Sequence, residues 1–100
     1  MVEVIIPFKE SFRTAMLTDK KTKTSRNKKY GKSGDTFKKF GAVFEIISVE
    51  KHPLKKVAEE WFFEEGCLTA EEFKNIWISL HPLKGYEKDK EVFVHTFKRI

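Results

Sequence analysis

Cysteine is nearly absent from this chain of 100 residues, in which Cys67 is the only one. No internal disulfide can therefore form. The N-terminus also lacks the basic start, the apolar run and the small-residue cleavage site of a secretory signal. Because disulfides belong to oxidising compartments and secretion needs a signal, both absences favour a reducing, cytoplasmic location.

Long apolar runs are missing as well. The longest, at 4–8 and 61–63, hold only a few residues, whereas a membrane helix needs about twenty. We therefore expect no contact with a membrane interior. The three prolines and five glycines are spread along the chain rather than gathered into a linker. With no repeat either, we expect one domain over residues 1–100.

Familiar cofactor and metal motifs are also absent. There is no Walker or dinucleotide-binding glycine pattern, and His52, His81 and His95 lack the spacing of metal ligands. We expect neither a cofactor nor a metal. His95 has phenylalanines on the same strand face and fits a hydrogen-bonded core histidine. Cys67, with no histidine near it, fits a small buried hydrophobe. No helix-turn-helix or zinc-finger pattern indicates sequence-specific DNA reading.

Positive charge, in contrast, is abundant and uneven. Residues 1–50 carry eleven basic and six acidic side chains, while residues 51–100 carry nine of each. Residues 20–39 alone hold nine Lys or Arg and a single acid, Asp35, a surplus larger than the net +5 of the whole chain. Charge of one sign repels itself, so such a segment favours a polyanionic partner.

Hydrophobic residues make up 40% of the chain and include ten Phe, enough for one modest core. Helical spacing predicts a helix over 53–66, with Pro53 at its first position and Gly66 as its stop. A second helix is expected over 69–81, where Thr69 and Glu72 form a capping box. A shorter one is expected over 9–18. The tryptophans at 61 and 77 lie on apolar helix faces and are expected in the core.

Strand patterns account for most of the remainder. Residues 42–49 suit a central strand and 91–99 another, and shorter strands are expected at 2–6, 22–26 and 36–39. The fold class is therefore α+β, with a small barrel or curled sheet of about five or six mixed strands and two to three helices.

The segment 22–26 combines hydroxyl and basic side chains. In a strand, Thr22, Thr24 and Arg26 would share one face and Lys23 and Ser25 the other. Hydroxyls beside a guanidinium suit a ligand that carries carbonyl and phosphate oxygens. The alternative is a solvated edge strand that its lysines protect from aggregation.

The loop that follows favours nucleic acid. Tyr30 stands among Lys28, Lys29 and Lys32, so a stacking ring is surrounded by charge that attracts phosphate. A flexible, solvated hairpin is the alternative interpretation of the same residues.

The octet from Asp19 to Arg26 resembles the signature of the ASCH family, a branch of the PUA-like superfamily. In that signature a Gly precedes a Lys by two residues, and an Arg closes the motif five residues after the Lys. Lys21 and Arg26 match, and Asp19 stands at the Gly position, where Asp tolerates a left-handed turn. Further similarity lies at 16–17, 34–35, 65–66 and 73–82. The resemblance implies a single ASCH domain with a PUA-like small β-barrel.

Thr24 stands where many members of the family have Glu. This resembles a subset of small ASCH proteins that act as amidohydrolases on acetylated cytidine, and whose catalytic Lys, Thr and Glu correspond to Lys21, Thr24 and Glu65. A threonine hydroxyl needs a base, and a lysine is one only when its pKa is depressed. Burial and basic neighbours lower the pKa of Lys21 while Glu65 raises it, so the sequence leaves the sign of the shift open.

That assignment carries a geometric condition. Residues three apart in a regular strand point to opposite faces, so Lys21 and Thr24 meet only if the chain bends near 21–23. Glu65, next to Gly66, either projects into a cleft or is an ordinary solvated helix carboxylate.

Together these patterns predict an ASCH domain that binds RNA or a modified nucleoside. If the domain is an enzyme, the expected reaction is amide hydrolysis of acetylated cytidine. A noncatalytic RNA-binding module is the alternative, and a protein-interaction domain that uses its basic face on acidic partners is a third. The side chains expected to contact the ligand are Lys20, Lys23, Arg26, Lys28, Lys29, Tyr30 and Lys32.

Overall fold

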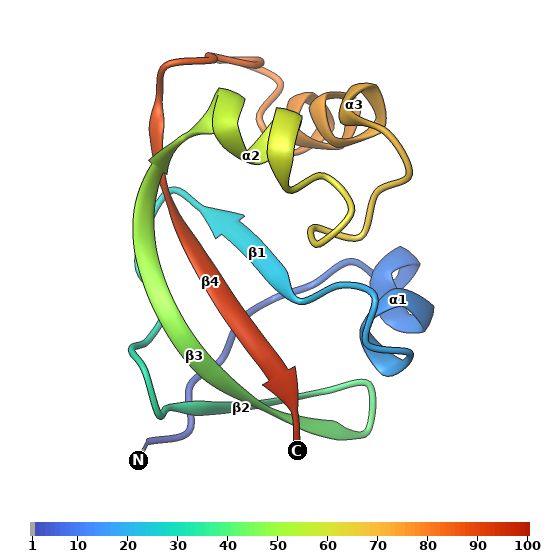
Figure 1. Cartoon of the computed structure of the whole chain (residues 1–100), viewed down its shortest axis with the longest axis vertical. Coiled ribbons are helices and arrows are strands. Elements are labelled where there is room, and N and C mark those ends of the chain that lie inside the picture. Colours follow the sequence, from blue (N-terminus) through green and yellow to red (C-terminus); the bar gives the residue numbers. More distant parts are fainter. Residues whose placement is uncertain (1) are drawn as a thin grey trace.

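The computed structural model describes residues 2–100 and contains a sheet with helices at its end and side (Figure 1). In chain order the elements are the 3₁₀ helix η1 (Glu10–Phe12), α1 (Arg13–Leu17), β1 (Lys23–Arg26), β2 (Thr36–Lys39), β3 (Ala42–Pro53), α2 (Leu54–Glu60), α3 (Ala70–Leu80) and β4 (Glu91–Arg99). Helices α2 and α3 lie together at one end of the sheet, and α1 lies beside the start of β1. None of the helices within residues 2–100 has the length and apolar character needed to cross a membrane.

The four strands form one curled antiparallel sheet in the order β1-β4-β3-β2. β3 runs the length of the molecule and arcs around it (Figure 1). Its pairing with β4 shifts register between Ile46 and Ser48, a bulge that adds bend and twist at this point. β4 is paired on both sides, which leaves β1 as an edge strand.

Side chains on the two faces of β4 pack into two different apolar clusters. Val92 and Val94 pack with residues of α2 and α3, such as Leu54 and Trp77. Phe97 points the other way, since side chains alternate along a strand, and packs with Phe37, Phe44, Met16, Ile46 and Ile6. The first cluster holds the helices on the sheet, and the second holds the N-terminal segment beneath it.

Two of the expected strands, 36–39 and 91–99, have the observed bounds of β2 and β4. The expected five or six strands are wrong, because residues 2–100 contain four named strands. The expected mixture of strand directions is also wrong, because every neighbouring pair is antiparallel. Segment 2–6 makes only an isolated parallel bridge, Glu3 with Thr36. Its two backbone hydrogen bonds to Thr36 are too few for a strand. Pro7, which has no backbone N–H, then prevents further pairing.

The helices differ from expectation mainly in length. α2 ends at Glu60, since Trp61 leaves the helical region with φ −124° and ψ 19°. Residues 61–66 continue as turns up to Gly66, whose φ of +94° only glycine adopts without strain. Trp61 packs against the first cluster but is only partly buried, whereas Trp77 is buried, as expected. Thr69 caps α3 by accepting a hydrogen bond from the Glu72 backbone N–H at 3.0 Å, as its capping-box pattern predicted.

Candidate functional site

A cavity of about 540 Å³ lies along the free edge of β1. Because β1 is an edge strand, side chains from both of its faces reach this space. The other walls come from residues 7–12, from the turn at 65–67 and from one side of α3. The lining residues used below are Phe8, Phe12, Lys21, Thr24, Ser25, Arg26, Lys28, Tyr30, Glu65, Cys67, Phe73, Ile76 and Trp77.

The chain bends sharply between α1 and β1. Asp19 has a φ of +62°, the left-handed turn that Asp tolerates. The backbone N–H groups of Lys20 and Lys21 both donate to the Ala15 carbonyl, and β1 then begins at Lys23 rather than at residue 22. Lys21 therefore precedes the regular strand, and its side chain lines the same cavity as Thr24. The chain thus bends before β1, as the assignment requires, but the Lys21 amine bonds to the Lys23 and Glu65 carbonyls rather than to Thr24 Oγ1.

The Lys21 amine is held by three oxygens. Its Nζ lies 2.9 Å from the Lys23 carbonyl, 2.6 Å from the Glu65 carbonyl and 3.6 Å from Glu65 Oε1. The Phe12 ring lies below it, with the centroid 4.3 Å from Nζ. Only 3% of the residue is exposed, and this burial lowers the pKa of Lys21 against the opposing pull of Glu65.

Glu65 faces Lys21 from the turn after α2. Its carboxylate accepts a hydrogen bond from the Ser25 hydroxyl at 2.7 Å, and 4% of the residue is exposed. Burial raises the pKa of Glu65, although Lys21 and the Ser25 bonds act in the opposite direction. Glu65 is thus not an ordinary solvated carboxylate. Both shifts favour the uncharged forms, a neutral amine beside a protonated carboxyl.

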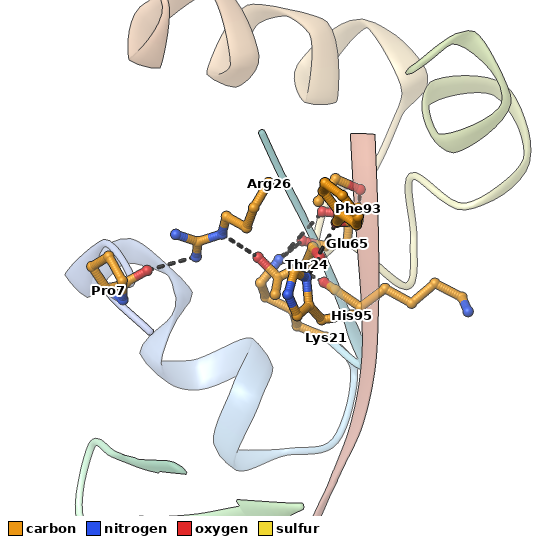
Figure 2. A network of polar contacts seen from close by, with 9 residues as sticks. Pro7, Lys21, Thr24, Arg26, Glu65, Phe93 and His95 are labelled. Atoms are coloured by element: carbon orange, nitrogen blue, oxygen red, sulfur yellow. Dashed lines mark hydrogen bonds and ion pairs between the residues drawn. The ribbon is translucent and has the colours of Figure 1, made fainter. Parts of the chain in front are cut away.

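Thr24 is held from above by Arg26, as Figure 2 shows. The Arg26 Nε–H donates to Thr24 Oγ1 at 2.9 Å, and its terminal N–H donates to the Pro7 carbonyl at 2.6 Å. The guanidinium also stacks over the Phe8 and Tyr30 rings, 4.9 and 5.6 Å from their centroids. The bond from Arg26 occupies a lone pair of the hydroxyl oxygen and leaves its proton free for a base.

Some of the other residues expected to contact the ligand line the cavity, and others do not. Lys28 and Tyr30 line the cavity, with the Lys28 Nζ 5.0 Å from the Tyr30 ring centroid. Lys23 points elsewhere, since its Nζ bonds to Thr96 Oγ1 at 2.9 Å and lies over the Trp61 ring. Three more of the expected lysines, Lys20, Lys29 and Lys32, are exposed and do not line the cavity.

Sequence reasoning missed several residues that form the cavity. Ser25 was assigned to the face opposite Thr24, yet its hydroxyl binds Glu65. Phe12, Phe73 and Ile76 form apolar walls, and their helical spacing alone indicated only a core. Cys67 also lines the cavity, but burial raises the pKa of its thiol to about 11, which leaves it uncharged near neutral pH.

His95 lies behind Thr24, fully buried and hydrogen-bonded, as expected of a core histidine. No group of three or more His, Cys, Asp or Glu side chains suited to a metal ion occurs within residues 2–100.

Comparisons with known proteins identify the fold. No family model matches the chain, and no curated protein matches it in sequence. A crystal structure of an ASCH domain from Lactobacillus crispatus JV V101 is similar, with a TM-score of 0.70 and 16% identity over 98% of this chain and 78% of that one. The fold is ASCH-like.

Two further solved structures share the ASCH-like fold. Protein EF3133 from Enterococcus faecalis V583, assigned to the family DUF984, gives a TM-score of 0.65 and 19% identity over 99% of this chain and 78% of its own. The hypothetical protein PH0355 gives 0.68 and 15% identity over 99% of this chain and 96% of its own. At such identities the likeness concerns the fold, so the chemistry must be argued from the residues of this chain.

Proposed function

We propose that the cavity binds a modified nucleoside, free or within RNA, and hydrolyses the acetyl amide of acetylated cytidine. One arrangement carries the proposal: Lys21, Thr24 and Glu65, from two separate segments, line one cavity together and are each at most 4% exposed. The volume of about 540 Å³ lies within the roughly 300–1,000 Å³ of small-molecule pockets. Apolar and aromatic walls suit a flat base, and a few polar groups gather at one end.

The first chemical step uses Lys21 as a base. A neutral amine donates its two hydrogens to the Lys23 and Glu65 carbonyls and keeps a lone pair for the Thr24 proton. As that proton leaves, Thr24 Oγ1 bonds to the acetyl carbon. The Arg26 Nε–H bond to Oγ1 favours loss of the proton.

The second step uses Glu65 as an acid. As the bond from the acetyl carbon to the cytosine amine breaks, the protonated carboxyl gives its proton to the departing nitrogen. Cytidine leaves, and the acetyl group remains as an ester on Thr24. Water then attacks the ester and gives one proton to Glu65, while Thr24 recovers its own from Lys21, and acetic acid departs and loses its remaining proton to the solvent.

The direct test is incubation of the purified protein with acetylcytidine, followed by chromatography of cytidine. We expect hydrolysis in the wild type and a loss of about 100-fold or more in Lys21→Ala and in Thr24→Ala, because each removes a group that acts in the transition state. Thr24→Ser should retain part of the activity.

Lys38→Ala and Thr18→Ala are matched controls, because both residues are exposed and neither lines the cavity. Both should hydrolyse acetylcytidine at the wild-type rate. Full activity in Lys21→Ala and Thr24→Ala would contradict the assigned roles.

A noncatalytic RNA-binding module is the second candidate. A specific cluster at the cavity favours it, in which Arg26 and Lys28 both lie over the Tyr30 ring. An aromatic ring flanked by cations can stack a base and hold the adjoining phosphate. Under this candidate the wild type binds RNA and leaves acetylcytidine intact.

A further inference from the structure

His95 joins three parts of the molecule behind the cavity. It belongs to β4 and is 0% exposed. Its Nε2 lies 3.0 Å from the Tyr30 backbone nitrogen, and its Nδ1 lies 3.2 Å from the carbonyl oxygens of Thr24 and Phe93. The ring therefore sits between the strand that carries Thr24 and the loop that carries Tyr30.

Only one protonation state satisfies all of these contacts. A backbone N–H donates and never accepts, so Nε2 must present a lone pair to Tyr30. Backbone carbonyls only accept, so Nδ1 must carry the hydrogen. The ring is thus neutral in the Nδ1–H form. A proton added to Nε2 would face the Tyr30 N–H and break that bond.

The Tyr30 bond matters because the loop 27–32 has few backbone hydrogen bonds to the rest of the molecule, another being that of the Lys32 N–H to Asp35 Oδ2 at 3.1 Å. The Tyr30 ring rests on His95 with the centroids 6.1 Å apart, and faces Arg26 and Lys28 on its other sides. Gly31 is packed so tightly that an added Cβ would lie 2.9 Å from Ile46 Cδ1. Tyr30 lines the cavity, so loss of its backbone bond alters the cavity wall.

We propose that His95 is a positioning residue that fastens the Tyr30 loop to the strand of Thr24, and that protonation of its ring releases the loop and opens the cavity wall. Weaker ligand binding in acid follows. The loop movement rests on the contacts of His95 alone, whereas the identity of the ligand rests on the proposed function.

The surroundings set the direction of the pH dependence. Burial lowers the pKa of His95, the carbonyls of Thr24 and Phe93 raise it, and the cations Arg26 and Lys29 lower it further. On β3, the residue paired with His95 is Val49, which carries no charge. Release therefore occurs on the acid side of the usual histidine value of about 6.5.

Nuclear magnetic resonance on the ligand-free protein tests the loop movement. We expect the Nδ1–H tautomer at neutral pH, and a Tyr30 amide shift that follows the His95 ring titration with the same midpoint. The protection of the Tyr30 amide against hydrogen exchange should fall about tenfold for each pH unit as the pH is lowered towards that midpoint, and should level off below it, because release takes up one proton.

The matched variant is His95→Gln, since a glutamine side chain can accept from Tyr30 and donate to Thr24 but does not titrate near neutral pH. Its Tyr30 amide should keep a constant shift across the same range. An Nε2–H tautomer, a Tyr30 amide that stays protected once the ring is protonated, a ring that stays neutral until the protein unfolds, or a transition that persists in His95→Gln would each overturn the proposal.

Binding of acetylcytidine to the Thr24→Ala protein separates this inference from the proposed function. We expect binding to weaken in acid in that background and to become pH-independent when His95→Gln is added. If acetylcytidine fails to bind at any pH while the Tyr30 transition is seen, the proposed function is wrong and the role of His95 stands. Binding that weakens equally in acid with and without His95→Gln would overturn the coupling.

Discussion

At the scale of single residues, the notable feature is a buried pair of ionisable groups, Lys21 and Glu65. Taking such groups out of water is unfavourable even in the uncharged forms that burial favours, unless their polar atoms make hydrogen bonds inside the protein. Here two carbonyls hold the amine and Ser25 holds the carboxyl. The pair is therefore better explained by chemistry than by stability.

This leads to a prediction for stability. Lys21→Met or Glu65→Gln alone should lower the free energy of unfolding by about 2 kcal/mol, because each leaves buried polar atoms without their hydrogen-bond partners. The double variant should recover most of that loss, or exceed the wild type, while remaining inactive. Urea denaturation measures all three.

The exposed pair Lys55–Asp89 is the control, with both side chains largely in water. Its removal should change stability by less than about 1 kcal/mol. A Lys21→Met/Glu65→Gln protein that loses the sum of the two single effects would contradict the explanation.

The sequence predicted part of the site at this scale. Lys21, Thr24 and Glu65 came from a family resemblance, and they remain a functional prediction although they line one cavity. Ser25 was missed because alternation along a strand separates neighbours onto opposite faces. At a free strand edge both faces border the same space, and only the sheet order β1-β4-β3-β2 reveals that β1 is an edge.

At the scale of elements, α3 forms one wall of the cavity and depends on its first turn. Thr69 Oγ1 accepts from the Glu72 backbone N–H, and the Glu72 carboxylate accepts from the Leu68 N–H at 3.2 Å. The first bond satisfies an N–H group that the helix itself leaves free, and the second ties the residue before the cap to the first turn. Phe73 and Trp77 then follow on the buried side.

Removal of the cap should loosen this wall. We expect Thr69→Ala to lower the free energy of unfolding by about 1 kcal/mol, seen as a lower melting temperature. Ser79→Ala is the control, because its hydroxyl binds a carbonyl on the exposed side near the other end of α3 and its loss should cost less than about 0.5 kcal/mol. Equal effects of the two substitutions would show that the cap does not hold α3.

The elements show where sequence patterns suffice. Strands 36–39 and 91–99 were predicted with their observed bounds, since turns and alternation marked both ends. The helix expected to reach residue 66 stops at Glu60. The turn that follows makes hydrogen bonds to a segment distant in sequence, since the Glu64 carbonyl accepts from the N–H groups of Thr22 and Lys23. Apolar spacing continues through this turn, and only the tertiary contact distinguishes it from helix.

At the scale of the whole molecule, charge is distributed unevenly around the cavity. The net charge is +5, and the excess belongs to the first half of the chain. Lys28 stands at the cavity with Tyr30, while Lys29 and Lys32 extend from the same loop into solvent. An anionic chain that enters the cavity would therefore meet positive charge around this loop.

The RNA-binding candidate predicts a strong salt dependence. Binding of a single-stranded RNA should weaken with salt, and the slope of log affinity against log salt should become shallower by about 0.7 for each phosphate that the protein no longer neutralises. Lys28→Gln and Lys29→Gln should each reduce the slope, whereas Lys55→Gln, at the start of α2, should not. Fluorescence anisotropy at several salt concentrations measures this, and a slope unchanged by both loop substitutions would exclude these lysines from the interface.

The free edge of β1 has one further consequence. Unpaired N–H and C=O groups on an edge strand are a template on which another chain can add a strand and begin an aggregate. At Lys23 both outward groups are already occupied within the molecule, the N–H by the Glu64 carbonyl and the C=O by the Lys21 amine. The side chain proposed as the catalytic base thus also blocks intermolecular sheet growth, and its removal would expose a self-association surface together with any loss of activity.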